Sequence, residues 1–243
     1  MKNNTIVTGS SSGIGKELVK LLLKKGNYVL GIDIKDIDMG TSKYNHIITD
    51  LSNPEQVIND LNEIDLFPNY SGLVNVAGIT IPTRDNDDIY AKLKKFEKTA
   101  KVNLYAPFIL SELFFRSRKK PYIESSIVNV SSIGAFQGFP GNPSYCSSKG
   151  GLEALTRSMA LDYQQKNIRV NCIRPGYTET PMNKKSLDDP ILKEKRSNQT
   201  VMGRWAKPYE IAESIEYFLS QKSSYITGTT LTVDGGWIIK GMV

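Results

Sequence analysis

The chain contains few of the residues that form metal sites and disulfide frameworks. Its 243 residues include two cysteines and one histidine. Two cysteines are too few for a disulfide framework, and we expect Cys146 and Cys172 to be small buried residues. His46 has no clustered cysteine or histidine beside it, so the sequence predicts no metal site.

Long apolar segments are also absent. No apolar run approaches the ~20 residues needed to cross a bilayer, and no apolar signal segment precedes the first strand pattern. We therefore expect a cytoplasmic protein without a membrane partner. No linker rich in proline, glycine and serine, or like charges divides the chain, so residues 1–243 are predicted to form a single α/β domain.

The charge of the chain is positive but dispersed. There are 31 Lys and Arg against 25 Asp and Glu, a formal net charge of +6. Short basic groups occur at 116–120 and 183–185, and no nucleic-acid recognition motif accompanies them, so a nucleic-acid partner is not expected. The remaining interpretations are solvated helix ends, or a basic rim that attracts an anionic substrate or an acidic carrier protein.

A glycine-rich segment follows the first apolar stretch. Residues 5–8 are strand-like, Gly9 to Gly15 reads Gly-x-x-x-Gly-x-Gly, and an apolar helical period runs from Leu18 to Leu23. Glycines at such a strand-to-helix turn let the backbone approach a pyrophosphate, which the helix N-terminus attracts. The spacing differs from the commonest dinucleotide fingerprint, and a tight turn without a ligand is the alternative.

The next strand pattern, residues 28–33, ends in Asp33, eighteen residues after Gly15. A carboxylate at this place accepts hydrogen bonds from the adenosine ribose and repels a 2′-phosphate. The sequence therefore favours NAD over NADP.

Tyr145 and Lys149 stand four residues apart, which places them on one face of a helix. A phenol titrates near pH ~10, so it needs a neighbouring cation to act as a base at neutral pH. Lys149 can supply that cation. Taken alone, this pair is more typical of a partly exposed helix face.

The motifs together resemble the short-chain dehydrogenase/reductase family, of the single-domain kind, from Thr5 to Gly236. They occur in the family's order: Thr8-Gly9-x-x-x-Gly13-x-Gly15, Asp50-Leu51, Asn75-x-Ala77-Gly78, Asn103, Ser132, Tyr145-x-x-x-Lys149 and Pro175-Gly176. Alternating strand and helix patterns predict a parallel sheet, with strands near 4–8, 28–33, 46–49, 72–76, 126–131, 168–173 and 229–233. The resemblance implies a Rossmann-like, doubly wound, seven-stranded sheet in the order 3-2-1-4-5-6-7, with helices on both faces.

The resemblance also implies catalytic roles. Tyr145 would be the general base in alcohol oxidation and the general acid in carbonyl reduction, and Ser132 would stabilise charge on the substrate oxygen. Lys149 would lower the tyrosine pKa and bind the nicotinamide ribose, and Asn103 would hold a water in a proton relay to Lys149. Ser131 competes for the role of Ser132, but the thirteen-residue spacing to Tyr145 matches the family for Ser132.

Cofactor contacts are implied at several strand ends. Asp50 and Leu51 would contact adenine, the segment from Asn75 to Gly78 the ribose, and the loop after Pro175 the nicotinamide carboxamide. The full expected set is Gly9, Ser11, Ser12, Gly13, Ile14, Gly15, Asp33, Ile34, Asp50, Leu51, Asn75, Ala77, Gly78, Tyr145, Lys149, Pro175, Gly176, Thr178 and Thr180.

The family's variable substrate lid corresponds to residues 181–202, which are polar and basic here. Such a lid favours a polar or anionic substrate, for example a sugar derivative or a hydroxy acid. The opposite wall is expected to include Phe136, Gln137, Phe139 and Asn142.

These expectations describe an NAD-dependent enzyme that interconverts a secondary alcohol and a ketone. One alternative is an NADPH-dependent 3-oxoacyl carrier-protein reductase, with basic groups near Arg118 and Lys120 for an acidic carrier. That class often has Arg in the glycine-rich turn, where this chain has Ser12. A second alternative is a non-catalytic NAD-binding regulator.

The family resemblance further implies a homo-oligomer, a dimer or a tetramer. Helices expected around 101–116 and 150–165, and the C-terminal segment 229–237, resemble its pairing surfaces. The apolar residues Trp237, Ile238 and Ile239 would pack either against a neighbouring subunit or within their own.

Overall fold

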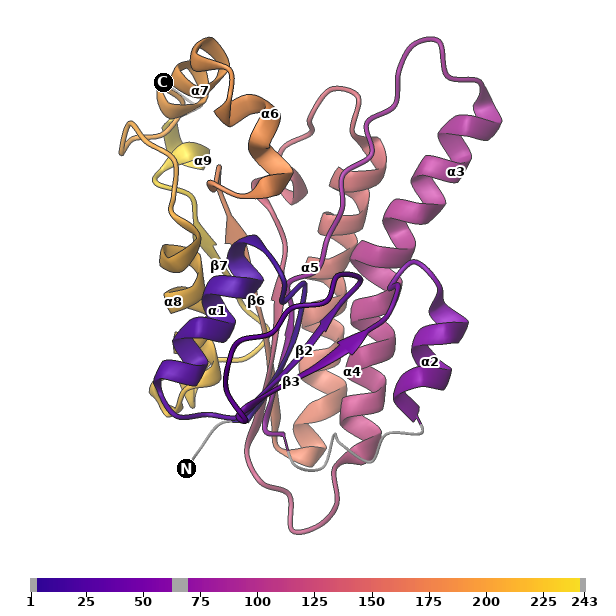
Figure 1. Cartoon of the computed structure of the whole chain (residues 1–243), viewed down its shortest axis with the longest axis vertical. Coiled ribbons are helices and arrows are strands. Elements are labelled where there is room, and N and C mark those ends of the chain that lie inside the picture. Colours follow the sequence, from indigo (N-terminus) through magenta and orange to yellow (C-terminus); the bar gives the residue numbers. More distant parts are fainter. Residues whose placement is uncertain (1–3, 63–69, 241–243) are drawn as a thin grey trace.

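The computed structural model describes residues 4–62 and 70–240, which form a parallel sheet between two layers of helices (Figure 1). Its strands are β1 (Thr5–Thr8), β2 (Val29–Asp33), β3 (Tyr44–Ile48), β4 (Gly72–Asn75), β5 (Ser125–Val130), β6 (Ile168–Pro175) and β7 (Thr230–Val233). All neighbouring pairs are parallel, in the order β3-β2-β1-β4-β5-β6-β7. The predicted doubly wound fold is confirmed.

Helices cover both faces of the sheet (Figure 1). One layer holds α1 (Gly13–Lys24) and α8 (Pro208–Leu219), and the other holds α2 (Pro54–Asn62), α4 (Ala106–Ser117) and α5 (Pro143–Tyr163). Helix α3 (Ile89–Ala100) precedes α4, and a π-helical turn (Lys101–Tyr105) joins the two. Short helices are α6 (Lys184–Leu187), α7 (Pro190–Ser197) and α9 (Trp237–Lys240).

Consecutive strand residues supply two separate cores. Ile6 and Ile127 pack toward α4 and α5, whereas their neighbours Val7 and Val128 pack toward α1 and α8. Side chains alternate between the faces of a strand, so a sheet covered on both sides needs apolar residues at successive positions. This requirement explains the continuous apolar runs in the central strands.

Two strands extend beyond their predicted bounds. β3 begins at Tyr44 instead of residue 46, because Tyr44 pairs with Val29 and its ring is buried. β6 continues to Pro175 instead of residue 173, because Arg174 and Pro175 pair with β7. Proline lacks an N–H, and the last position of a strand tolerates it.

The carboxyl ends of the strands meet at one end of the sheet, where the loops that carry the expected site residues emerge. Residues 181–202, which include α6 and α7, stand over this end (Figure 1). Among residues 4–62 and 70–240, no helix has the length and apolar character to cross a membrane.

A largely buried ion pair ties α5 to the end of β6. The Arg174 guanidinium donates to both carboxylate oxygens of Glu153, at 2.8 and 2.5 Å, and to the hydroxyl of Thr232 on β7 at 3.1 Å. Glu153 is buried and Arg174 is partly exposed. Removing one member of such a pair leaves the other charge poorly solvated.

We therefore predict that Glu153→Gln lowers the free energy of unfolding by about 2 kcal/mol, because Arg174 loses its carboxylate partner. Urea unfolding followed by circular dichroism measures this change. Lys184→Gln, which breaks an exposed pair with Asp188, serves as the control and should change stability by less than about 0.5 kcal/mol. Equal effects of the two variants would contradict the assignment.

Candidate active site

Tyr145 and Lys149 lie one turn apart near the beginning of α5, which starts at Pro143. Tyr145 is partly buried and Lys149 is buried. The tyrosine ring passes close to Gly134, where an added Cβ would lie 3.2 Å from Cε1 of Tyr145. The turn after β5 therefore packs directly against the phenol.

The two candidate serines after β5 are used differently. Ser131 donates its hydroxyl to the backbone carbonyl of Lys149 at 3.2 Å. Ser132 accepts from the N–H of Gly134 at 3.1 Å, and its side chain is close enough to the Tyr145 phenol to lower the pKa of that group. Ser131 thus braces the helix, and Ser132 is the serine that reaches the phenol.

The Lys149 ammonium is held at the end of β5. Its Nζ donates to the carbonyl of Val130 at 2.7 Å. An added Cβ at Gly78 would lie 3.3 Å from this nitrogen and 3.4 Å from Oδ1 of Asn103, so three segments meet here. Burial of the charged form lowers the pKa of Lys149 to about 8.

The pKa of Tyr145 differs from the sequence-based expectation. Burial raises the pKa of Tyr145, while the Ser132 side chain acts in the opposite direction. Lys149 donates to the Val130 carbonyl and does not contribute to the shift of the Tyr145 pKa. The residues of the protein alone therefore do not lower the pKa of the Tyr145 phenol, as the spacing of Tyr145 and Lys149 had suggested they would.

Asn103 lies fully buried in the π-helical turn between α3 and α4. Its side chain accepts from the N–H of Ile79 at 2.8 Å and donates to the Ile79 carbonyl at 2.9 Å. It also donates to Ser148, beside Lys149, at 3.1 Å. π-Turns within α-helices often occur at functional sites, and this one joins the loop after β4 to α5.

The glycine-rich turn has the geometry of an anion-binding loop. Gly9 has a φ of +68°, which side-chain-bearing residues rarely adopt, and a Cβ at Gly15 would lie 2.1 Å from the Gly9 carbonyl. Ser12 makes no side-chain hydrogen bond to the first turn of α1. The beginning of that helix is thus without a side-chain cap, and such helix N-termini attract anions.

Asp33 lies at the end of β2, next to this turn. Its carboxylate accepts from the N–H of Ser11 at 3.1 Å and from the N–H of Lys35 at 3.0 Å. The side chain of the following residue, Ile34, is 60% exposed. A negative charge therefore lies at the rim of the turn, beside an apolar surface.

A chain of hydrogen bonds supports the loop after Asp33 from behind. The Tyr44 hydroxyl lies 3.3 Å from Ser10 Oγ and 2.7 Å from Nδ1 of His46, and Nε2 of His46 lies 3.0 Å from the Lys35 carbonyl. A Cβ at Gly31 would lie 2.1 Å from the Tyr44 hydroxyl oxygen. Glycine at this position leaves the room that the tyrosine occupies.

The other expected cofactor residues surround the same turn. Gly9 approaches Ala77, Gly13 approaches Thr180, and Gly176 approaches Asp234, each within 3.3 Å of an added Cβ. Asp50 accepts from the N–H of Ser52, and Leu51 is buried. Asn75, Ile14, Pro175 and Thr178 occupy the corresponding strand ends and turns.

The glycines let backbone segments pack closely around the turn, the helix start has no side-chain cap, and Asp33 is held beside it. These residues fit a dinucleotide. Among the described residues, no group of three His, Cys, Asp or Glu side chains is placed to hold a metal ion.

Sequence reasoning did not identify an aromatic group beside the site. Phe139 and Tyr177 each contact Trp237 edge to face, with ring centroids 6.2 Å apart in both pairs, and Tyr177 lies 5.2 Å from Trp205. Trp237 was expected to pack either against a neighbouring subunit or within its own. It is buried within its own chain. The only sequence signal was that the chain's two tryptophans flank the lid segment and the C-terminal glycine pair.

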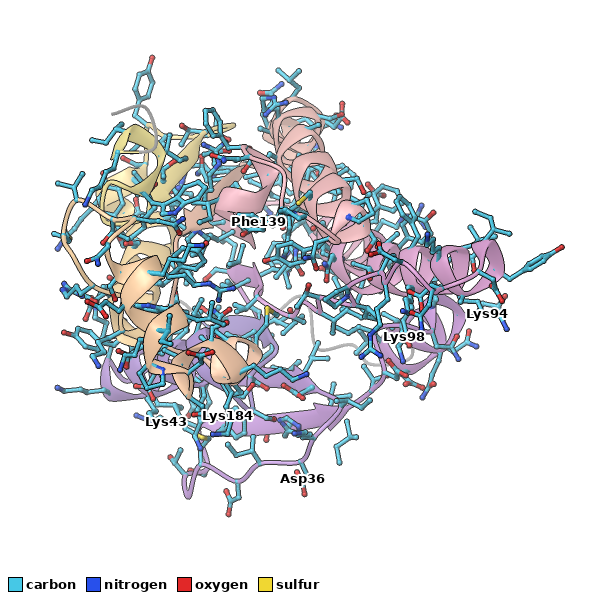
Figure 2. The ribbon with its side chains drawn as sticks, turned by 90° about the horizontal axis from the view of Figure 1, so that it is seen from above. Asp36, Lys43, Lys94, Lys98, Phe139 and Lys184 are labelled. Atoms are coloured by element: carbon cyan, nitrogen blue, oxygen red, sulfur yellow. The ribbon has the colours of Figure 1, made fainter. Side chains whose placement is uncertain are left out.

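The four residues expected in the substrate wall do not all lie together. Phe139 approaches Gly134 and Tyr145, and lies toward the middle of the face seen in Figure 2. Phe136 is 58% exposed and stacks on Arg174, at 5.7 Å. Asn142 accepts from Thr80, and Gln137 is exposed. Phe136 and Phe139 therefore have different partners, Arg174 for the first and Gly134 for the second.

We predict that Lys149→Met raises the free energy of unfolding at pH 7 by up to about 2 kcal/mol, because the charged amine is costly to bury. Below pH ~8 the amine is protonated in both states. Between about 8 and 10.5 the folded protein loses this proton first, so wild-type stability rises and the advantage of methionine shrinks. Urea unfolding at pH 7 and pH ~10 measures the difference.

The exposed Lys195→Met is the matched control and should show no such pH dependence. A Lys149→Met variant less stable than wild type at pH 7 would contradict the proposed cost of burial.

Comparison with known proteins identifies the family. A family model described as enoyl-(acyl carrier protein) reductase matches residues 9–238. A 3-oxoacyl-[acyl-carrier-protein] reductase from Thermotoga maritima is 31% identical, over 96% of this chain and 97% of its own length. An L-xylulose reductase from Caenorhabditis elegans is 33% identical, over 96% and 94%.

Solved structures agree. A 4-hydroxyisoleucine dehydrogenase complexed with NADH has a TM-score of 0.89 and 31% identity, covering 98% of this chain and 99% of its own. A Beutenbergia cavernae protein described as an NAD(P)-dependent gluconate 5-dehydrogenase, with bound NADP, has a TM-score of 0.89 and 28% identity, covering 98% and 97%. The chain belongs to the short-chain dehydrogenase/reductase family, whose members are nicotinamide-dependent oxidoreductases acting on CH–OH groups.

Proposed function

We propose that this protein is an NAD-dependent dehydrogenase that interconverts a polar secondary alcohol and its ketone. The observation that carries the proposal is the arrangement at the start of α5. The Ser132 side chain lies by the Tyr145 phenol and acts to lower its pKa, and the Lys149 ammonium is buried one turn away beside Gly78 and Asn103.

In this proposal Tyr145 is the proton-transferring residue. During oxidation its phenolate oxygen takes the alcohol proton, and during reduction its hydroxyl returns a proton to the carbonyl oxygen. Ser132 donates a hydrogen bond to the same substrate oxygen and stabilises the charge that develops there. The nicotinamide cofactor, when bound, accepts or supplies the hydride.

Lys149 and Asn103 support the proton transfer. The Lys149 amine, with a pKa near 8, is able to release and recover a proton close to neutral pH. We assign it to the nicotinamide ribose and to stabilisation of the Tyr145 phenolate. Asn103 fixes Ile79 and Ser148 around this lysine, and its π-turn is the proposed place of the relay water.

Cofactor binding is assigned to the glycine-rich turn, the strand ends and the loop from Pro175 to Thr180. Asp33 supports NAD over NADP, because its carboxylate is fixed at the rim by two backbone N–H groups and would repel a 2′-phosphate. Structures similar to this chain hold NADH in one case and NADP in another, so the preference rests on this chain's own residues.

The substrate is assigned to the polar class. The lid segment 181–202 has exposed lysines, and the similar structures include an enzyme of 4-hydroxyisoleucine and an aldohexose dehydrogenase from Thermoplasma acidophilum. The alternative, an NADPH-dependent 3-oxoacyl carrier-protein reductase, is favoured by the names of several relatives. A regulator that binds NAD without catalysis would not need the four proposed catalytic residues.

The first test is reduction of NAD and NADP at 340 nm with sugars, polyols, hydroxy acids and hydroxyacyl thioesters. We expect NAD to be reduced with a polar alcohol, and Tyr145→Phe to lower kcat by at least about 1,000-fold while NAD binding is retained. Turnover confined to NADP and hydroxyacyl thioesters would establish the carrier-protein reductase instead. Activity retained by Tyr145→Phe would refute the proposed proton transfer.

A second test concerns Asp33. Replacing it with serine removes the charge that opposes a 2′-phosphate, so the ratio of kcat/KM for NADP to that for NAD should rise by at least about 10-fold. Asp38→Asn, a carboxylate of the same loop that accepts from Gly40, is the matched control and should leave the ratio unchanged. An unchanged ratio in the Asp33 variant would remove the basis for the NAD assignment.

We further propose a homo-oligomer, a dimer or a tetramer, acting in the cytoplasm. Exposed apolar side chains on the outer helices support the association, among them Tyr105, Phe108 and Leu161. Both cysteines are free thiols, which fits a reducing compartment. Light scattering after size exclusion measures the mass, and a monomer at micromolar concentration would contradict the assembly.

A further inference from the structure

We infer that Arg196 binds the carboxylate of the substrate and that the preferred substrate is consequently a hydroxy acid or keto acid. This inference rests on the proposed dehydrogenase function and narrows its substrate class. It is argued from four observations on this side chain: its support, its lack of a polar partner, its connection to the catalytic tyrosine and the pairing of the cations around it.

Arg196 is supported by aromatic rings. It lies in the last turn of α7, and its guanidinium carbon is 5.0 Å from the ring centroid of Tyr177 and 5.8 Å from that of Trp205. The Trp205 indole N–H donates to the Lys193 carbonyl on the same helix at 3.2 Å. The guanidinium therefore lies beside two aromatic rings, contacts that use none of its N–H donors in hydrogen bonds to polar atoms.

No polar atom of the described residues satisfies this guanidinium. Arg196 is partly buried, yet no hydrogen bond or ion pair is formed by its side chain within residues 4–62 and 70–240. Arg174, which is also partly buried, and Arg169, which is buried, make several hydrogen bonds each. A partly buried group with five donors is costly to leave unbonded, and an anionic ligand would remove that cost.

A continuous row of rings connects Arg196 to the proposed proton donor. Tyr177 touches Trp237, Trp237 touches Phe139, and Phe139 lies against Gly134 next to the Tyr145 ring. Tyr177 also follows Pro175 and Gly176, the residues assigned to the nicotinamide. Figure 2 views the molecule from above and labels Phe139, and Lys184 of the segment 181–202, which lie apart on the face seen there.

The cations around Arg196 are only partly paired, because Lys193 and Lys195 on α7 are exposed and form no ion pair within the described residues. Arg204 forms two hydrogen bonds with Glu210, Lys207 pairs with Glu179, and Lys184 pairs with Asp188. A phosphate dianion is usually held by several free cations, whereas one guanidinium matches one carboxylate through two parallel hydrogen bonds. The planar group of Arg196 therefore matches a single carboxylate, and the Lys195→Gln variant described below tests whether the lysines of α7 contribute.

The inference is tested with matched substrates, a hydroxy acid and its uncharged amide, identified from the hydroxy-acid panel. Arg196→Gln should lower kcat/KM for the acid by about 10- to 100-fold, because a charge-assisted pair of hydrogen bonds is lost. For the amide the change should remain within about threefold. Arg196→Lys keeps the charge but not the planar fork, and should give an intermediate loss for the acid.

Lys195→Gln is the matched control, since Lys195 is the exposed neighbour of Arg196 on α7 and loses the same charge. It should leave kcat/KM for the acid within about twofold of wild type. Equal losses for acid and amide in Arg196→Gln would mean that the residue only fastens α7, and would overturn the inference. An equal loss in Lys195→Gln would mean that Arg196 acts only through general electrostatic attraction, and would also overturn the inference.

A binding measurement separates this inference from the proposed catalytic function. Both tryptophans of the chain, Trp205 and Trp237, belong to the aromatic group beside Arg196, so their fluorescence reports on this place. With NAD present, succinate should change the emission of wild type and of Tyr145→Phe, but not that of Arg196→Gln. Succinate binding with equal affinity to Arg196→Gln overturns the carboxylate assignment, whatever the activity assay gives.

The two failures are distinguishable. Oxidation of neutral alcohols alone, with loss in Tyr145→Phe, would leave the dehydrogenase intact and refute the role of Arg196. Carboxylate binding through Arg196 without any alcohol oxidation would support the role of Arg196 and refute the dehydrogenase function.

Discussion

The arrangement at the centre of this protein depends on one buried cation. The Lys149 ammonium is placed at the end of β5, where its contact with the Val130 carbonyl compensates part of the loss of water. Gly78 lies close to this amine, Ser131 donates to the backbone carbonyl of Lys149, and Asn103 ties the loop after β4 to α5. The loops after β4 and β5 and the start of α5 are therefore fixed relative to one another by what surrounds a single amine.

This dependence carries an energetic consequence. Groups that transfer protons at neutral pH must have a perturbed pKa, and burial is the means of perturbation available here. The same burial of Lys149 opposes folding. The ion pair between Glu153 and Arg174, one turn further along α5, compensates part of that cost. The proposed catalytic residues and this stabilising ion pair thus occupy successive turns of one helix.

Much of the fold was predictable because its signals are local or periodic. The apolar runs gave the seven strands in their correct order along the chain, and the strand-to-helix glycine turn gave the position of the anion site. The ends of β3 and β6 were not predictable, since they depend on pairing partners, Val29 and β7, that are far away in sequence. The role of Ser131 in bracing α5 and the aromatic group around Tyr177 likewise arise from contacts between distant segments. The raised pKa of Tyr145 was missed because burial cannot be read from a four-residue spacing.

The hydrogen-bond chain behind Asp33 has a consequence for how cofactor preference can change. Ser10, Tyr44 and His46 hold the Lys35 carbonyl, and this chain fits only because residue 31 is glycine. A side chain at 31 would displace Tyr44 and release the loop that aims the Asp33 carboxylate. Under the proposed NAD assignment, a substitution at this interior position of β2 would alter nucleotide selectivity through Tyr44 and the loop, and a search limited to the residues proposed to line the site would overlook it.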